Sequence, residues 1–391
     1  MARLIFYYHK INSYSFNALA GAIDAEAELA DIPIGIALTS DDLHEQVSEA
    51  LRSHSRAVVA FSIMTCQFEE ASQLIRRLSG EHGGRLIILA GGPHVTARPR
   101  EVLRAGADIV FRGEAENSFP RVLKAIFRGT TCAAIQSADT PTDLDRTFSF
   151  SPKREMFGPI EITRGCAFAC RFCQTSQIFG VKLRHRSVEE IVRQAESLRS
   201  INRKVVRLLS PNAFSYGSPD GRKLNLDAIR NLLAALRESL AADGRIIFAH
   251  FPSEARPEHI TPDTLSLLDE FADNDEIVIG AQSGSRRMLD ACGRAHTGED
   301  VVSAVACARK YGYKIIVDFI FGLPGESEED RHESLSVMKE IVDMGARIHP
   351  HIFAPLPQTA FANEPPGRIS PFFLDALNQF RKHGAIYGNA D

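Results

Sequence analysis

The chain has 391 residues, of which 44% are hydrophobic and 24% are charged, and its formal net charge at pH 7 is -4. This composition is ordinary for a globular protein that is long enough for two domains with sizeable cores, and it indicates no disorder. The charge shows no basic excess of the kind that recruits nucleic acid, and no apolar run approaches the ~20 residues that cross a membrane, so we expect neither partner.

Up to about residue 130, short β-branched apolar runs alternate with amphipathic stretches of helical length. This alternation is typical of a parallel sheet covered by helices on both faces, so we predict an α/β, doubly wound, Rossmann-like domain over 1–130. The predicted strands cover 4–8, 32–38, 57–63, 86–90 and 108–111. The predicted helices cover 16–29, 42–53, 69–80 and 116–127.

Three loops follow the third, fourth and fifth predicted strands of this domain. A doubly wound sheet binds its ligands beyond the carboxyl ends of its strands, which is where these loops lie. Glycines in two of the loops allow the backbone to approach a ligand closely. The candidate ligand-binding residues are Thr65, Gln67, Gly91, Gly92, His94, Gly113 and Glu114.

Between residues 129 and 157, Thr, Ser, Asp and Pro break the pattern, which predicts a surface linker over 131–157. The alternation then resumes, and six strand and helix units are too few for a closed eight-stranded barrel. We therefore predict a curved, partly open (β/α)6 barrel over 158–356, with catalytic groups at the carboxyl ends of its strands. Its strands are predicted at 160–163, 205–209, 246–249, 276–280, 315–321 and 347–353. A tail over 357–391 contains one predicted helix, 371–383.

Cys166, Cys170 and Cys173 follow the first strand of the second domain, with three and then two residues between them. Three thiolates on one tight loop can hold three irons of a [4Fe-4S] cluster, since thiolate is the ligand that such clusters take. The fourth iron then has no protein ligand and can chelate a small molecule through an amine and a carboxylate. Phe172 would lie beside that molecule. These three cysteines are our predicted catalytic and metal-ligating residues.

Zinc binding and a disulfide are two other uses of these cysteines. Zinc usually takes four ligands in two pairs, and the sequence contains no second Cys-x2-Cys or Cys/His pair. A disulfide needs an oxidising compartment, but the sequence opens without the features of a secretory signal, so we expect a cytoplasmic protein with reduced thiols. Cys132, Cys292 and Cys307 are interpreted as small buried hydrophobes, and Cys66 has no assigned role.

The cysteine triad resembles the pattern of the radical S-adenosylmethionine (SAM) superfamily, and the resemblance extends over 158–356. Residues 280–285 are similar to the segment that these enzymes place along the SAM ribose, with Gln282 in place of the commoner Glu. Residues 322–326 resemble the turn near the adenine, although a plain Pro-Gly turn is an alternative. The resemblance implies a [4Fe-4S] cluster and SAM as cofactors. The residues assigned to the cofactors of this domain are Phe172, Ser210, Asn212, Glu254, Arg256, Gln282, Ser283, Gly284, Gly322 and Leu323.

Within this resemblance, Glu254 and Arg256 could supply both signs of charge for the amine and the carboxylate of SAM; a surface salt bridge is the alternative. His349 and His351 are one residue apart on the sixth strand, so their side chains face the same side. They either line the cavity as acid/base groups or are satisfied by hydrogen bonds.

The first domain, through residues 90–97 and 112–116, resembles the cobalamin-binding domain that precedes the radical SAM domain in a large subfamily, the cobalamin-binding-domain radical SAM enzymes. Corrinoid proteins that ligate cobalt through histidine carry Asp-x-His-x-x-Gly after the first strand, where this chain has residues 10–12 without a histidine. Asp42 and His44 form a near match that lacks the glycine. Two alternatives follow: cobalamin bound without a histidine ligand, or a domain that kept the fold and lost the cofactor. His94 is interpreted as a cofactor contact, with cobalt ligation as the alternative.

The resemblance implies reductive cleavage of SAM to a 5'-deoxyadenosyl radical, followed by methyl transfer from cobalamin to a small metabolite. An electron donor such as flavodoxin or ferredoxin would reduce the cluster. Two rival functions stay open: a cobalamin-independent transfer of a 3-amino-3-carboxypropyl group or a rearrangement, and a non-enzymatic iron-sulfur or corrinoid carrier or sensor. The second rival leaves the SAM-like segments without a role.

Overall fold

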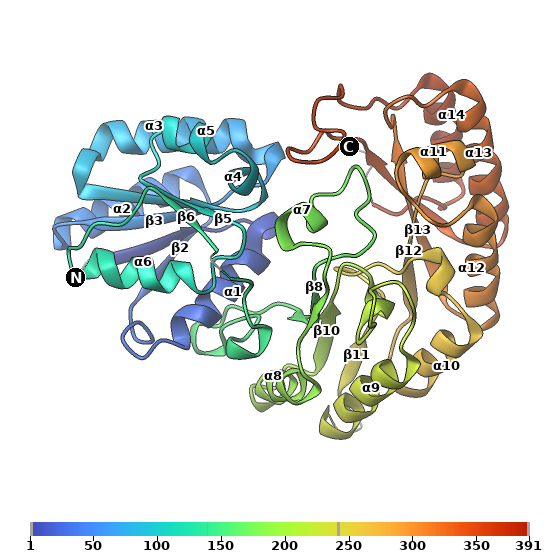
Figure 1. The fold of residues 1–391 in the computed structure, drawn as a ribbon, viewed down its shortest axis with the longest axis horizontal. Helices are drawn as coiled ribbons and strands as arrows, with labels where there is room; N and C mark the ends of the chain where they lie inside the picture. Colours follow the sequence, from blue (N-terminus) through green and yellow to red (C-terminus); the bar gives the residue numbers. More distant parts are fainter. Residues whose placement is uncertain (1–2, 139, 241–242, 389–391) are drawn as a thin grey trace. The chain divides into compact units, whose positions relative to one another are not determined.

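The computed structural model describes residues 3–138, 140–240 and 243–388. The chain divides into two compact units, Met1–Pro159 and Ile160–Asp391. Each unit is an α/β structure with parallel sheets (Figure 1), as the sequence predicted.

The first unit contains a six-stranded parallel sheet in the order β2-β1-β3-β4-β5-β6. Its strands are β1 Arg3–Tyr7, β2 Ile34–Ala37, β3 Ala57–Ser62, β4 Leu86–Gly91, β5 Ile109–Arg112 and β6 Ile135–Ser137. Its helices are α1 Ser13–Asp24, α2 Ser40–Ser53, α3 Phe68–His82, α4 Pro93–Ala97, α5 Pro99–Arg104 and α6 Ser118–Phe127. Helices cover both faces of this sheet (Figure 1), which is the doubly wound arrangement.

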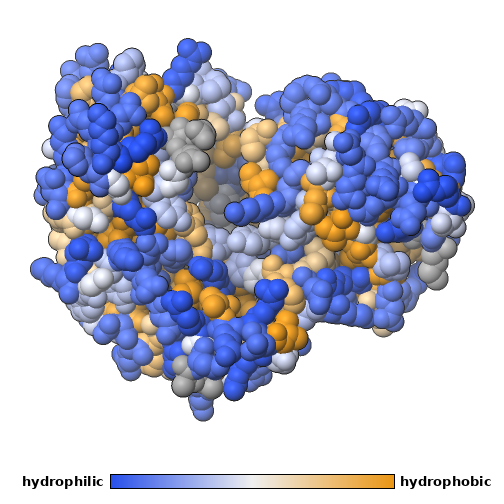
Figure 2. Space-filling view, turned by 180° about the vertical axis from the view of Figure 1, so that it is seen from behind, coloured by the Kyte–Doolittle hydropathy of each residue, from blue (hydrophilic) through white to orange (hydrophobic). Residues whose placement is uncertain are grey.

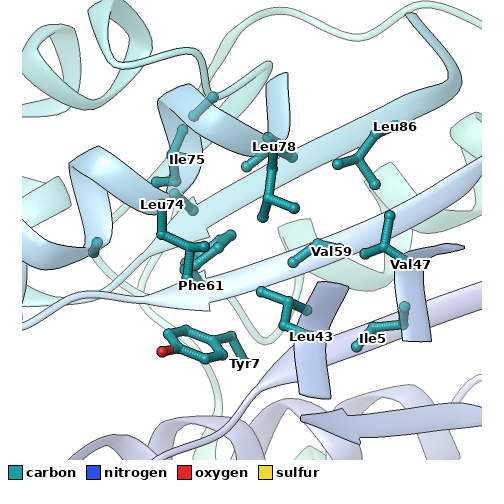
Figure 3. Close-up of a cluster of buried hydrophobic side chains, with 14 of the residues drawn as sticks. Ile5, Tyr7, Leu43, Val47, Val59, Phe61, Leu74, Ile75, Leu78 and Leu86 are labelled. Carbon is teal, nitrogen blue, oxygen red and sulfur yellow. The ribbon is translucent and has the colours of Figure 1, made fainter. Parts of the chain in front are cut away.

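Successive side chains of a strand point to opposite faces of the sheet, so the core of the first unit is divided into two clusters, one on each face. In β1, Ile5 and Tyr7 join the cluster under α2 and α3, whereas Leu4 and Phe6 join the cluster under α1 and α6. Figure 3 shows the first of these clusters, in which side chains of β1, β3 and β4 meet those of α2 and α3. Full burial of each large side chain contributes about 1.5–3 kcal/mol, so the alternation itself holds the helices to the sheet.

The segment predicted as a surface linker, 131–157, packs on the first unit. Its β6 pairs in parallel with β5, through Val110 and Ile135, and so adds a sixth strand to the five that were predicted. Phe150 is fully buried, and Arg154 forms an ion pair with Asp24 in which the Nε to Oδ1 distance is 2.7 Å. The apolar residues of this segment are too far apart to give a periodic pattern, so its docking could not be predicted from the sequence.

The second unit contains six parallel strands that follow one another in chain order, in the sheets β7-β10-β11 and β12-β13-β14. A bridge joins Ala255, in the segment that follows β11, to Ile279 of β12, and the two sheets together form the predicted partial (β/α)6 barrel. The strands are β7 Ile160–Glu161, β10 Val205–Leu209, β11 Arg245–Ile247, β12 Glu276–Gln282, β13 Lys314–Phe321 and β14 Arg347–Ile352. A short antiparallel pair, β8 Thr163–Arg164 and β9 Arg184–His185, flanks the first strand.

Helices α8, α9, α10, α12 and α13 lie outside the strands of the second unit (Figure 1). The helices of this unit are α7 Thr175–Phe179, α8 Val188–Ser200, α9 Leu226–Leu240, α10 Pro262–Phe271, α11 Arg286–Ala291, α12 Gly298–Lys310, α13 Glu328–Asp343 and α14 Pro371–Lys382. Several begin at side-chain caps: the Ser187 hydroxyl accepts from the backbone N–H of Glu190 at 3.2 Å at the start of α8. The last helix matches the one predicted at 371–383.

On the face shown in Figure 2, hydrophobic residues form scattered patches among hydrophilic ones. In the described part of the chain, no helix has both the length and the apolar character needed to span a membrane.

Candidate active site

The three cysteines lie on the loop between β8 and α7. Gly165 begins the loop with φ of +92°, and a Cβ at this position would lie only 2.6 Å from a facing carbonyl oxygen, so glycine is required. Ala169 also adopts a left-handed conformation, and the N–H of Cys173 donates to the carbonyl of Cys170 at 3.0 Å. These two turns keep the cysteines on one short loop.

Two arginines lie beside the cysteines and carry the positive charge of the site. Arg294 donates from Nη1 to the Sγ of Cys170 at 3.7 Å and is almost fully buried. The Cζ of Arg256 lies 3.7 Å from the centre of the Phe168 ring, and its Nε donates to Glu258 at 2.5 Å. Among the described residues, Arg256 Nη2 and Arg294 Nε are buried and find no hydrogen-bond partner.

This donor set fits the predicted cluster. Burial raises the pKa of the Cys166 and Cys173 thiols, so their thiolates depend on a bound cation, and iron supplies one. The unpartnered guanidinium nitrogens suit an anionic group, either the thiolate-ligated cluster or a carboxylate of a chelated molecule. Sequence reasoning missed Arg294, which follows α11 in a stretch without any periodic pattern.

A pocket of about 230 Å³ lies at the carboxyl ends of β12, β13 and β14. Phe172 lines it, so the aromatic residue beside the last cysteine faces the pocket as expected. Glu254, Gln282, Asp318 and His351 contribute polar groups to its wall. Asp318 was missed, although a charged residue inside an apolar strand is a signal that the sequence does carry.

Glu254 belongs to this pocket and not to a pair with Arg256. The Nε2 of Gln282 donates to its Oε2 at 3.5 Å. Desolvation, reinforced by the negative charge of Asp318, raises the pKa of Glu254 to about 7. Arg256 pairs with Glu258 instead and is only 3% exposed, so the alternative, a surface salt bridge, does not describe these two residues. Their assignment to the amine and the carboxylate of SAM stays a prediction.

Of the segment 280–285, Gln282 is the residue that lines the pocket. The register of β12 against β13 shifts between Gly280 and Gln282, and such a bulge re-aims a side chain. Ser283 and Gly284 instead contact Ser334 of α13: the hydroxyls of Ser283 and Ser334 are 3.1 Å apart, and the N–H of Gly284 donates to Ser334 at 3.0 Å. Their assignment to SAM stays a prediction.

The other predicted SAM residues of the second unit have protein partners. Ser210 and Asn212 are buried, and Asn212 makes hydrogen bonds to Ser215 at 2.5 Å and to His259 at 2.9 Å. Gly322 lies against the backbone of 367–368. Leu323 belongs to an apolar cluster on which Phe172 packs. Of these four residues, Leu323 thus lies in the cluster beside Phe172. The assignment of all four to SAM stays a prediction.

In the first unit, the expected loop at 91–96 is the end of β4 followed by α4. Gly91 ends the strand and Gly92, with φ of +101°, precedes the helix. His94 lies inside α4 and is 5% exposed; its ring stacks on Phe68 with 4.0 Å between centroids, and burial lowers its pKa. This packing gives His94 a structural role, and its contact with a cofactor stays a prediction.

The remaining candidates of the first unit lie near the carboxyl ends of its strands. The carboxylate of Glu114 accepts the N–H of Thr142 at 2.9 Å, and the N–H of Gly113 donates to Thr96 at 3.0 Å. Thr65 lies in a single turn of 3-10 helix after β3. The turn also contains Gln67, which lines a small cavity with Tyr7, His9, Asn12 and Glu70.

Asn12, in the position where a cobalt-binding histidine motif would fall, donates from Nδ2 to the carbonyl of Ser62 at 3.0 Å and so ties the β1 loop to β3. His44 of the near match lies 3.3 Å from Glu81, on the helices. Cys292 is buried as predicted, whereas Cys132 and Cys307, which were also predicted to be buried, are only half-buried because each lies near the edge of its core; Cys66 is exposed.

Comparisons with known proteins match both units. The model of the radical SAM superfamily matches residues 160–338, and that of the B12 binding domain matches residues 7–123. An uncharacterized protein of Methanopyrus kandleri is 25% identical over 389 residues, covering 84% of this chain and 71% of that protein. An uncharacterized methyltransferase of Pyrococcus horikoshii is 22% identical over 337 residues, covering 80% and 70%.

Among solved structures, the radical SAM methyltransferase TsrM from Kitasatospora setae, with cobalamin and a [4Fe-4S] cluster bound, has a TM-score of 0.66 and 17% identity. The match covers 93% of this chain and 78% of TsrM, and at this identity it concerns the fold. The domain order, the cysteine loop and the two family matches agree. The chain therefore belongs to the cobalamin-binding-domain radical SAM enzymes, a family whose cofactors are a [4Fe-4S] cluster, SAM and cobalamin.

Proposed function

We propose that this protein is a cobalamin-dependent radical SAM methyltransferase that acts on a small metabolite. The observation that carries the proposal is the union of a B12 binding domain and a radical SAM domain in one chain. The Pyrococcus horikoshii relative is named a methyltransferase, which supports methyl as the transferred group.

Cys166, Cys170 and Cys173 would hold the cluster. When bound, the reduced cluster supplies the electron that cleaves SAM, and cobalamin supplies a transferable methyl group. Arg294 and Arg256 place positive charge beside the thiolates and stabilise negative charge there. Phe172, packed on the apolar cluster around Leu323, forms a water-excluding wall of the pocket.

The pocket supports a small substrate with both polar and apolar groups. Glu254, Asp318 and His351 contribute polar groups to its wall, and Ile320 and Phe353 contribute apolar ones. With a pKa of about 7, Glu254 can hold or release a proton at its carboxylate near neutral pH.

The proposal is tested by anaerobic reconstitution of the cluster, followed by reduction with SAM that carries a deuterated methyl group, with and without cobalamin. A small-molecule extract serves as the substrate pool, and mass spectrometry identifies the products. We expect 5'-deoxyadenosine, S-adenosylhomocysteine and a labelled small molecule, the last two only with cobalamin.

Other products contradict the proposal in distinct ways. The product 5'-methylthioadenosine would identify aminocarboxypropyl transfer. Turnover that is indifferent to cobalamin would show that the first unit has lost its cofactor. A reduced cluster whose spectrum does not respond to SAM would favour the non-enzymatic carrier or sensor.

A further inference from the structure

Two neighbouring strands of the second unit bring a carboxylate and two imidazoles together. Asp318 of β13 is the direct register partner of His349 of β14, and Ile320 is the partner of His351. Because side chains alternate along a strand, His349 and His351 project from the same face, and Asp318 projects beside them. The chemistry proposed above uses none of these three side chains to hold a cofactor.

The distances within this cluster match those between ligands of one metal ion. The Nδ1 of His349 lies 2.8 Å from Asp318 Oδ1, and the Nε2 of His351 lies 3.6 Å from the same oxygen. One nitrogen from each ring and one carboxylate oxygen all lie within 4.8 Å of one another. Ligands bound at about 2.0–2.1 Å to one tetrahedral ion stand about 3.3 Å apart, between the two measured distances.

The charge of the cluster favours a cation. Asp318 is buried, and Glu254 lies within hydrogen-bonding range of it. Within the described residues, the ion pairs of Asp318 are with the two histidines, and no lysine or arginine forms one with it. Two acidic side chains side by side, one of them buried and paired with imidazoles that can bind a metal ion when neutral, would be stabilised by a bound divalent ion.

Neighbouring rings hold the imidazole of His349 in place, whereas the imidazole of His351 is accessible from the pocket. The rings of Phe251 and Tyr387 pack edge-on against His349, with centroids 5.4 Å and 5.3 Å away. The His351 side chain is 43% exposed and lines the same pocket as Phe172. A metal held by these three residues would therefore have coordination positions directed toward the pocket.

We propose that Asp318, His349 and His351 form a site for a divalent first-row transition metal, such as zinc, in the wall of the substrate pocket. Two histidines and one carboxylate are a ligand set that such ions take with open positions remaining. The open positions would bind an oxygen or nitrogen atom of the substrate, a role that rests on the proposed function. The metal site itself does not depend on that function.

Zinc is the probe for this site, because iron and cobalt are already contributed by the cluster and by cobalamin. The reconstituted holoenzyme is freed of loosely bound metal with a chelator and titrated with zinc, and bound zinc, iron and cobalt are counted by mass spectrometry. Among the described residues, His44, Glu81 and His82 form one other group with the spacing of metal ligands, so all proteins carry His44→Gln to remove it. Thermal unfolding with and without zinc gives a second readout.

We expect this parent protein to bind about one zinc ion per chain and to gain thermal stability from it. His351→Gln should weaken zinc binding at least ~100-fold, since loss of even an outer partner of a metal site costs about 10–100-fold. Asp318→Asn should do the same. His250→Gln is the matched control, because His250 faces Glu276 at 3.4 Å and is not in the cluster.

The proposal is overturned if the parent protein binds no zinc, or if His351→Gln binds zinc as tightly as the His250→Gln control does. His351 is partly exposed, so its replacement should leave the fold intact even if Asp318→Asn does not fold. No step of the measurement involves SAM cleavage or methyl transfer. Failure of the methyltransferase proposal would therefore leave the zinc result unchanged, and the reverse also holds.

Discussion

The two units place different kinds of side chain at the carboxyl ends of their strands. In the first unit, the edge is built from glycines, a 3-10 turn and a stacked histidine, and its hydrogen bonds tie loops to one another. In the second unit, the edge contains three thiols, two buried arginines and a carboxylate beside two histidines. The first arrangement suits a ligand held by shape and backbone contacts, whereas the second suits chemistry driven by charge.

The largest expected effect is the loss of SAM cleavage in the second unit while the first unit still binds cobalamin. We expect Cys166→Ala, Cys170→Ala or Cys173→Ala to lower SAM cleavage by roughly 1,000-fold or more, as when a catalytic unit loses one member. Cobalamin binding by the first unit should persist. Cys307→Ala, a half-buried cysteine on α12, is the control and should leave SAM cleavage unchanged. Anaerobic assays of 5'-deoxyadenosine measure SAM cleavage in each variant. Substantial turnover in any variant of Cys166, Cys170 or Cys173 would contradict their assignment as cluster ligands.

A substitution in the first unit should abolish cobalamin binding and leave the iron-sulfur cluster of the second unit in place. A side chain at Gly92 would place Cβ 2.7 Å from the backbone nitrogen of Ile63, at φ of +101°. We expect Gly92→Val to cost about 2–4 kcal/mol of stability and to abolish cobalamin binding, while the iron content of the second unit is kept.

The matched control for this strain is Gly129→Ala, which also has positive φ but open space around it and should cost only about 1 kcal/mol. Urea unfolding is followed by far-ultraviolet circular dichroism, because the chain has no tryptophan. Equal losses of unfolding free energy in the two variants would show that the close approach of Gly92 to the backbone of Ile63 does not matter for stability.

A smaller effect concerns acid sensitivity in the second unit. Although burial opposes ionisation, hydrogen bonds from Arg287, Ser285 and Ser327 hold the pKa of Asp330 well below its ordinary value. A lowered carboxyl pKa contributes stability that is present above the unfolded pKa and is lost as pH falls through the native pKa. Since the unfolded pKa is about 3.9, the loss begins below about pH 5.

We therefore expect Asp330→Asn to be about 1–2 kcal/mol less stable than the wild type at pH 7, with the difference narrowing by about 1 kcal/mol at pH 3. Urea unfolding at both pH values measures it. A difference that is the same at pH 3 and pH 7 would mean that the ionised form of Asp330 is not favoured by the fold.

The smallest expected effect is at His44, which pairs with Glu81 on the helices of the first unit. We expect His44→Gln to change the free energy of unfolding by no more than about 0.5 kcal/mol, because an ion pair at the surface contributes little, and to leave cobalamin binding unchanged. Spectroscopic titration with hydroxocobalamin checks this. Weakened binding, or a shift in the cobalamin spectrum, would revive the near match to the cobalt-binding motif.

Where side chains repeat with a regular period, prediction from the sequence was accurate. The strand predicted at 205–209 is β10, Val205–Leu209, and the helix predicted at 371–383 is α14, Pro371–Lys382. The short helices α4 and α5 and the strand β6 were missed. Each is three to six residues long, so none carries enough periods of its own to be recognised.

Within the site, the three cysteines could be predicted from the sequence because their spacing along one loop indicates a cluster-binding motif. Arg294 could not, because its contact with Cys170 joins residues 124 positions apart. Glu254 and Arg256 show the same limit: they are neighbours in sequence, but one faces the pocket and the other binds Glu258.

The sequence by itself determined the family, the order of the two domains and the cysteine loop, because periodic burial and ligand spacing are local properties of the chain. Only the tertiary structure decided which charges meet. The register of β13 against β14 places Asp318 beside His349, and the bulge in β12 turns Gln282 toward Glu254. Such pairings depend on how strands and loops distant in sequence align, and packing of the whole unit sets that alignment.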